Sequence, residues 1–308
     1  MRPEDLDSFR LNLGSGSENA LAFILALMIF AVALGLRAEH FRFFREAPRL
    51  YFSGVFAQII GLPLLTLLIC FVIRPVPSVA LGMILVACCP GGNVSNLLAL
   101  YGRANTALSV SLTATSSVAA AFITPFSILF WSSLYPPTRN LLTEINLDAG
   151  SFLTQTMVIL ALPLLLGMLL AKLTPTLSAR LQKPLATLSG LGLAAIIIMT
   201  CIRYAPDYMA LGFGFVFLIG LAIAHNGLAF ALGYASAVFA RADIPSRRSL
   251  TLEVGIQNSG LGIVILLTQL DGLGGAGAIA GAWGTWHIIA GLILVGIYRR
   301  QDRRGAHV

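Results

Sequence analysis

One acidic residue, Glu253, lies inside a strongly apolar segment, whereas the other twelve lie near the N-terminus, in connections or in the C-terminal tail. A carboxylate inside a bilayer costs about 2.5–3.5 kcal/mol on insertion scales, so neighbouring groups must offset that cost. Glycines and oxygen-bearing side chains follow it directly, at Gly255, Gln257, Asn258, Ser259 and Gly260. This pattern predicts a cation site in a locally unwound helix.

A second stretch of this kind, from Cys88 to Asn96, interrupts an earlier apolar segment and contains Pro90, Gly91 and Gly92. Proline removes a backbone donor, and paired glycines tolerate unwinding. Single breaks also occur in membrane helices as simple kinks or packing sites. Two breaks, each rich in amide and hydroxyl groups, favour instead a binding site where two broken helices meet.

The composition places these stretches in a polytopic membrane protein. The chain has 308 residues, of which 57% are hydrophobic and 11% charged, and its mean hydropathy is +0.86. A soluble domain carries about 25% charged residues, so we expect neither a soluble enzyme nor a nucleic-acid partner. The net charge of +7 comes from basic residues in short connections, which is typical of a topology signal.

About nine apolar segments approach the 20 residues that a membrane-spanning helix needs, so we expect an all-α fold. Residues 1–18 are polar and slightly acidic, which argues against a cleavable signal peptide and for a retained first helix. The expected helices cover residues 19–36, 50–73, 79–101, 105–131, 151–171, 185–202, 208–238, 250–270 and 276–298.

The basic residues predict which ends of these helices face the cytoplasm. With nine helices, fifteen lysines and arginines fall on one side, including Arg37–Arg49 and the 299–308 tail, and five fall on the other, including Arg10 and Arg139. The positive-inside rule then places the N-terminus outside the cell and the basic tail in the cytoplasm. We expect a multi-pass protein of the inner (plasma) membrane.

Two three-helix blocks, residues 50–131 and 208–298, have opposite orientations in this topology. The middle helix of each block carries one of the two broken stretches. Corresponding breaks in inverted halves are a sequence pointer to the binding site of a transporter near the middle of the bilayer.

The motifs resemble the bile acid:sodium symporter family from the first to the last expected helix. The resemblance rests on the following residues: Cys88 to Gly92 with Ser95 and Asn96, Ala107 to Val110 with Thr113, Glu253 to Gly255 with Gln257 to Gly260, and the pairs His225-Asn226 and Trp286-His287.

The resemblance implies a core domain (50–131 and 208–298) with two crossing broken helices and a panel domain (19–36 and 151–202). It implies two Na⁺ sites, which a hard cation's need for oxygen ligands also fits. One would use Ser95, Asn96, Ser109, Thr113 and Glu253. The other would use Gln58, Glu253, Gln257 and the backbone carbonyls of Val254 and Ile256.

Substrate is expected between the two domains, near Asn93, Asn258, His287 and Ile288. The sequence departs from the family here: Asn93 stands where threonine is common, and Ile288 where asparagine is common. Ten-helix relatives also begin with a helix that this chain lacks. Taken by themselves, His225 and His287 are more typical of hydrogen-bonded packing residues than of proton carriers.

These observations predict a sodium-coupled symporter of an organic anion, bile-acid-like or another carboxylate or sulfonate with an apolar body, that works by alternating access. A proton-coupled carrier that uses Glu253 is the first alternative, because desolvation favours a protonated carboxyl group. A membrane scaffold without transport is the second, although it would not need paired broken helices.

Overall fold

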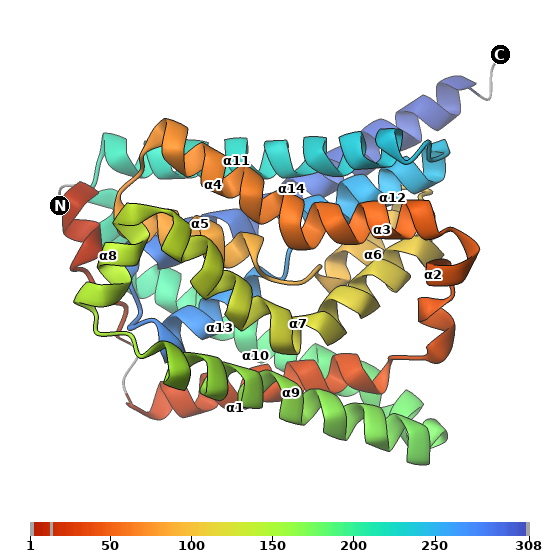
Figure 1. The fold of residues 1–308 in the computed structure, drawn as a ribbon, viewed down its shortest axis with the longest axis horizontal. Coiled ribbons are helices and arrows are strands. Elements are labelled where there is room, and N and C mark those ends of the chain that lie inside the picture. The colour runs from red at the N-terminus through yellow and green to blue at the C-terminus, as the bar shows by residue number, and fades with distance from the viewer. Residues whose placement is uncertain (1–2, 13–14, 306–308) are drawn as a thin grey trace.

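The computed structural model describes residues 3–12 and 15–305, which are almost entirely helical (Figure 1). Within these residues, β-type pairing is limited to two isolated bridges, Arg10 with Leu273 and Gly91 with Gln257. The expected all-α fold is confirmed.

In the part of the chain that the structure describes, six helical runs are long and apolar enough to cross a membrane. A seventh forms if α1 (Ser15–Leu34) is joined to the short segment after it, which bends away by 84°. The six runs are α3 (Pro48–Phe56) continued by the π-helical turn η3 (Ala57–Gly61) and α4 (Leu62–Ile73), then α7 (Thr106–Leu134), α9 (Ala149–Leu173), α10 (Pro175–Met209), α11 (Phe213–Phe239) and α14 (Gly274–Gly305).

The two remaining expected spans are each built from two short helices. The first is α5 (Pro77–Ala87) with α6 (Asn93–Tyr101), and the second is α12 (Ile244–Gly255) with α13 (Ser259–Gln269). Both breaks fall where the glycines and proline predicted them. None of these four short helices is long enough to cross a bilayer by itself, so the number of nine crossings remains a prediction.

Two helices extend well beyond their expected ends. The span expected at 185–202 is part of α10, which begins at Pro175 and therefore includes Arg180 and Lys183, both expected in a connection. The basic tail expected from residue 299 continues α14 as helix to Gly305. Hydropathy marks only the apolar part of a helix, and α10 continues through Pro184, a residue at which a helix often ends.

Shorter helices lie at the two ends of the molecule. The 3-10 turn η1 (Pro3–Asp7) and α8 (Pro136–Glu144) lie at the end marked by the N-terminus, and α2 (Phe43–Glu46) lies at the opposite end, where α14 leaves the molecule (Figure 1). A second 3-10 turn, η2 (Ala38–Phe41), links α1 to α2.

Three helices, α1, α9 and α10, pack against one another and form a group of their own, with α1 and α9 along the lower edge of Figure 1. Gly167 of α9 allows this close packing, because a side chain there would collide with Ala33 and the Phe30 carbonyl of α1. The group meets the remaining helices mainly through α7 and α13.

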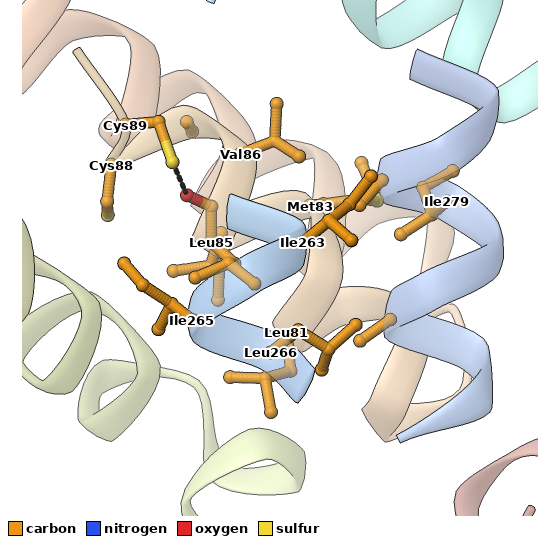
Figure 2. Packing of buried hydrophobic residues seen from close by; sticks show 14 of the residues in the cluster. Leu81, Met83, Leu85, Val86, Cys88, Cys89, Ile263, Ile265, Leu266 and Ile279 are labelled. Atoms are coloured by element: carbon orange, nitrogen blue, oxygen red, sulfur yellow. Dashed lines mark hydrogen bonds between the residues drawn. The ribbon is translucent and has the colours of Figure 1, made fainter. Parts of the chain in front are cut away.

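The other helices pack around α5, the most deeply buried element, in which every residue from Ser78 to Ala87 is buried. Figure 2 shows Leu81, Met83 and Leu85 packed against side chains of α13 and α14. A side chain at Gly82 would collide with the Ala276 backbone of α14. Cys88 and Cys89 lie in this cluster as small core residues, whereas Cys201 is exposed.

Candidate cation site at the crossing of two broken helices

The two breaks lie against each other and satisfy each other's backbone groups. The Gly92 N–H donates to the Ile256 carbonyl at 3.0 Å, and the Asn258 N–H donates to the Pro90 carbonyl at 2.8 Å. Gly91 and Gln257 form the isolated bridge between these two bonds. Unwound backbone at membrane depth is tolerated only where its polar groups find partners, and here each break supplies partners for the other.

Gly91 allows the unwound segment between α5 and α6 to lie close to the buried polar side chains. A Cβ atom there would collide with the Glu253 carboxylate and would lie 2.8 Å from Gln58 Nε2. The neighbouring Gly92 faces the Gln257 carbonyl. The paired glycines are therefore needed for close approach as well as for unwinding.

Three hydroxyl groups surround the carboxylate of Glu253, which is 1% exposed. Ser95 and Ser109 lie 2.7 Å and 2.9 Å from its Oε2 atom, and Thr113 lies 2.6 Å from its Oε1 atom. Thr113 also lies 3.2 Å from the amide oxygen of the half-buried Asn96. All five residues predicted for the first sodium site therefore lie together.

The local structure explains this convergence. Ser95 lies in the first turn of α6, directly after the break, and Ser109 and Thr113 are four residues apart and share one face of α7. Asn105 caps α7 through its side chain and donates its N–H to the Pro245 carbonyl at 3.1 Å. That bond fixes the start of α7 against the start of α12, the helix that carries Glu253.

The residues predicted for the second site form an adjacent cluster. Gln58 lies in the π-helical turn η3, a feature that often occurs at functional sites. Its amide nitrogen lies 3.5 Å from Gln257 Oε1, and Gln257 donates to the Val254 carbonyl at 2.8 Å. The Ile256 carbonyl accepts from Gly92, and its second lone pair stays available.

The charge balance of this region suits a monovalent cation. Among the described residues, no lysine or arginine forms an ion pair with Glu253. A buried carboxylate without a charged partner is costly, and a cation held by hydroxyl, amide and carbonyl oxygens would offset that cost. The donor set lacks the thiolate and imidazole ligands that softer transition metals prefer.

Of the residues predicted for the substrate site, Asn258 lines a small pocket between the three-helix group and the crossing. Its side chain caps α13 by accepting from the Leu261 N–H at 3.1 Å. Asn93 is exposed at the first turn of α6, and Ile288 is 38% exposed on α14. The pocket is lined by Met28, Ile29, Val32, Pro90, Ser117, Ala120, Ala121, Leu160, Leu164, Asn258 and Leu261.

The two membrane histidines pack inside the molecule. His287 is 4% exposed, and its Nδ1 atom lies 2.9 Å from the Trp283 carbonyl one turn earlier. His225 Nε2 lies 2.7 Å from the Thr66 hydroxyl, which donates to the Leu62 carbonyl and so must accept from His225. His287 does not line the pocket that contains Asn258.

Three residues that support the crossing were missed in the sequence. Ser116 accepts from the Gly91 N–H at 3.2 Å, and Thr124 donates to the Cys88 carbonyl at 2.9 Å. Both extend the face of α7 that carries Thr113, so the helical spacing could have indicated them. Asn226, which is fully buried, donates to the Gly255 carbonyl at 2.7 Å; the family motif included this residue, but its role at the break was not predicted.

Several known proteins resemble this chain in sequence. The model of the sodium bile acid symporter family matches residues 22–207. An uncharacterized sodium-dependent transporter of Bacillus subtilis, YocS, is 26% identical over 92% of this chain and 84% of its own length. The probable chloroplastic sodium/metabolite cotransporter BASS1 of Arabidopsis thaliana is 30% identical over 90% of this chain and 66% of its own length. A human sodium-dependent organic anion transporter is 26% identical over 77% of this chain and 61% of its own length.

Proposed function

This chain belongs to the sodium bile acid symporter family, and on that premise we propose that it is a sodium-coupled secondary transporter of an organic anion. The observation that carries the proposal is the Glu253 carboxylate, buried among the hydroxyls of Ser95, Ser109 and Thr113 without a basic partner. The names of its relatives, which include sodium-dependent transporters from a bacterium and from human, support the choice of ion.

Glu253 would serve two cations at once. One lies among Ser95, Asn96, Ser109 and Thr113, and the other among Gln58, Gln257 and the carbonyls of Val254 and Ile256. A proton would need only one carboxylate, so the surrounding oxygen atoms favour sodium over proton coupling.

The substrate would lie in the pocket beside the crossing. The N-terminus of α13 is directed toward this region, and a helix N-terminus favours negative charge. The wall contributed by α1 and α9 is apolar, with Met28, Ile29, Leu160 and Leu164. A carboxylate or sulfonate with an apolar body fits both features.

Transport would follow the alternating-access scheme, in which the three-helix group (the panel: α1, α9 and α10) and the remaining helices (the core) move against each other. The chain would lie in the plasma membrane, and by the positive-inside rule its N-terminus would be outside and the basic end of α14 in the cytoplasm. Sodium bound at the crossing would hold the N-terminus of α13 and Asn258 in place for the anion.

The test is a thermal-stability measurement on detergent-purified protein in sodium or potassium chloride at equal ionic strength. Sodium at a hundredfold excess over its dissociation constant should stabilise the protein by about 2.7 kcal/mol, and potassium should not. Glu253→Gln should lose this difference, whereas Glu39→Gln, which removes an exposed acid outside the site, should keep it. Equal stabilisation by both salts would contradict sodium coupling.

Anions are then screened as sodium-driven uptake into proteoliposomes, with cholate, other carboxylates and sulfonates as probes. Uptake that follows a pH gradient and ignores the sodium gradient would favour the proton-coupled alternative.

A further inference from the structure

The N-terminal strap, residues 3–12, lies across the end of the molecule where α5 begins and α13 connects to α14. Arg10 forms an ion pair of 2.7 Å with Asp271, the Leu11 N–H donates to the Gly272 carbonyl at 2.7 Å, and the Gly274 N–H donates to the Phe9 carbonyl at 2.8 Å. These bonds fasten the strap along the 271–274 loop of the core.

The strap also holds the start of α5. Asp7 Oδ1 accepts from the Ser78 N–H at 2.7 Å, which satisfies one of the free donors in the first turn of that helix. A carboxylate is favourable at this position because of the helix dipole. Two separate parts of the core are therefore bonded to one short segment.

On its other side, the strap is attached to the panel. The Tyr204 hydroxyl of α10 donates to the Asn12 carbonyl at 2.8 Å and accepts from the Asn12 N–H at 2.7 Å. The Phe9 ring meets the rings of Tyr204 and Tyr208 edge-on, with centroids 5.5 Å and 5.9 Å apart. The chain then continues into α1, so the strap must move with the panel.

The 271–274 loop is shaped to receive the strap. Asp271 and Gly272 both have positive φ angles, 56° and 57°. A Cβ atom at Gly272 would lie 2.6 Å from the Leu11 carbonyl oxygen, so glycine suits both the turn and the close contact. Tyr208 of the panel adds a direct bond, from its hydroxyl to the Gly274 carbonyl at 2.9 Å.

Resting on the transport function and topology proposed above, we propose that the strap is the extracytoplasmic gate of this transporter and that Arg10 with Asp271 is its latch. Panel and core cannot separate at this end while the strap remains bonded to the loop and to α5. The latch is suited to reversible opening, because its two side chains are 31% and 64% exposed and such ion pairs are weak.

The test measures whether breaking the latch opens the pocket to the outside. Ser117, which lines the pocket beside the crossing, is changed to cysteine in a Cys201→Ser background, because Cys201 is the exposed native cysteine. A membrane-impermeant maleimide is added to the outside of right-side-out vesicles, and the rate of labelling is measured.

Arg10→Gln should raise the labelling rate about two- to fivefold, the shift expected from a partly exposed ion pair. The charge reversal Arg10→Asp with Asp271→Arg should restore slow labelling. The matched control is Arg203→Gln, which removes an exposed basic residue whose guanidinium lies over the Tyr204 ring.

Tyr204→Phe is the second variant, because it removes both bonds to Asn12 and keeps the ring that packs against Phe9. It should also raise the rate of maleimide labelling. If Arg10→Gln does not fold, this variant still tests the proposal. Unchanged labelling in both variants, whether slow or already fast, would overturn the gate.

Stabilisation by sodium is measured for every protein in parallel. Loss of that effect in the parent protein would count against sodium-coupled transport itself. Retained stabilisation with unchanged labelling would count against the gate alone.

Discussion

At the scale of single residues, the site around Glu253 combines one charged group with neutral oxygen-bearing side chains. One carboxylate, three hydroxyls and two glutamine side chains form two adjacent groups of oxygen atoms that share Glu253. Each hydroxyl has a single hydrogen, so an oxygen that donates to the carboxylate keeps lone pairs for a cation. A cation at the proposed site would therefore bind without first breaking an ion pair.

Gly91→Ala tests how closely the unwound segment between α5 and α6 must approach Glu253. The added methyl group would collide with the carboxylate, and overpacking of this kind costs about 1–3 kcal/mol. We expect the sodium-dependent rise in melting temperature to be largely lost. Gly220→Ala is the matched control, because a Cβ atom at Gly220 meets nothing within 4 Å. If Gly91→Ala keeps the sodium-dependent rise in melting temperature, the unwound segment can shift to accommodate the methyl group.

The sequence indicated the residues around Glu253 because their chemistry is unusual inside apolar segments. It did not indicate that Asn226 and Thr124 hold carbonyls at the two breaks. A single hydroxyl or amide in a membrane helix is equally compatible with a bond to its own helix. Only the placement of another helix decides which bond forms.

At the scale of elements, the two broken helices are held at their outer ends as well as at the crossing. Arg248 of α12 is buried and forms a bidentate pair with Asp302 of α14, with bonds of 2.6 Å and 3.1 Å. It also donates to the Gly102 carbonyl at the end of α6, at 3.2 Å. One guanidinium therefore joins α6, α12 and α14.

Arg248→Met should lower stability because the carboxylate and the Gly102 carbonyl lose their donor. Hydrogen bonds to charged groups contribute about 1.5–3 kcal/mol, which should appear as a lower melting temperature in detergent. Arg300→Met, which replaces an exposed arginine in the same part of α14, should have little effect. Equal melting temperatures for the two variants would contradict this role of Arg248.

The elements themselves were largely predictable from length and composition, and the breaks were predictable from Pro90 and the glycines. The π-helical turn at Gln58 was not, because no residue in Ala57–Gly61 forces an i to i+5 bond. The continuation of α10 back to Pro175 was also missed, because hydropathy does not follow a helix into polar sequence. The features that could not be predicted depend on contacts between segments that are distant in the chain.

At the scale of the whole molecule, the basic connections and the acidic N-terminal strap lie at opposite ends. α2 and the end of α14 lie at one end, and the N-terminus and α8 lie at the other (Figure 1). The panel meets the core mainly through α7 and α13, and the strap adds further bonds at the N-terminal end.

The proposed topology predicts that Arg45 in α2 and Arg139 in α8 face opposite sides of the membrane. Single cysteines are introduced at each position in the Cys201→Ser background and treated with an impermeant maleimide. Cysteine at position 139 should be labelled in intact cells, and cysteine at position 45 only after the membrane is opened. Labelling of both in intact cells would contradict the orientation and the number of crossings.

The pairing of Gly91 with Gln257 has a consequence for how the protein is made. The ribosome delivers α5 and α6 to the membrane long before α12 and α13 exist, yet the Pro90 carbonyl and the Gly92 N–H find their backbone partners only in the later pair. At about 5–20 residues per second, the wait lasts on the order of ten seconds. Throughout that interval the nascent chain carries an unpaired break that lipid cannot satisfy, so water or the insertion machinery must shield it until the last third of the chain arrives. A chain that ends before α12 would therefore keep this break unpaired.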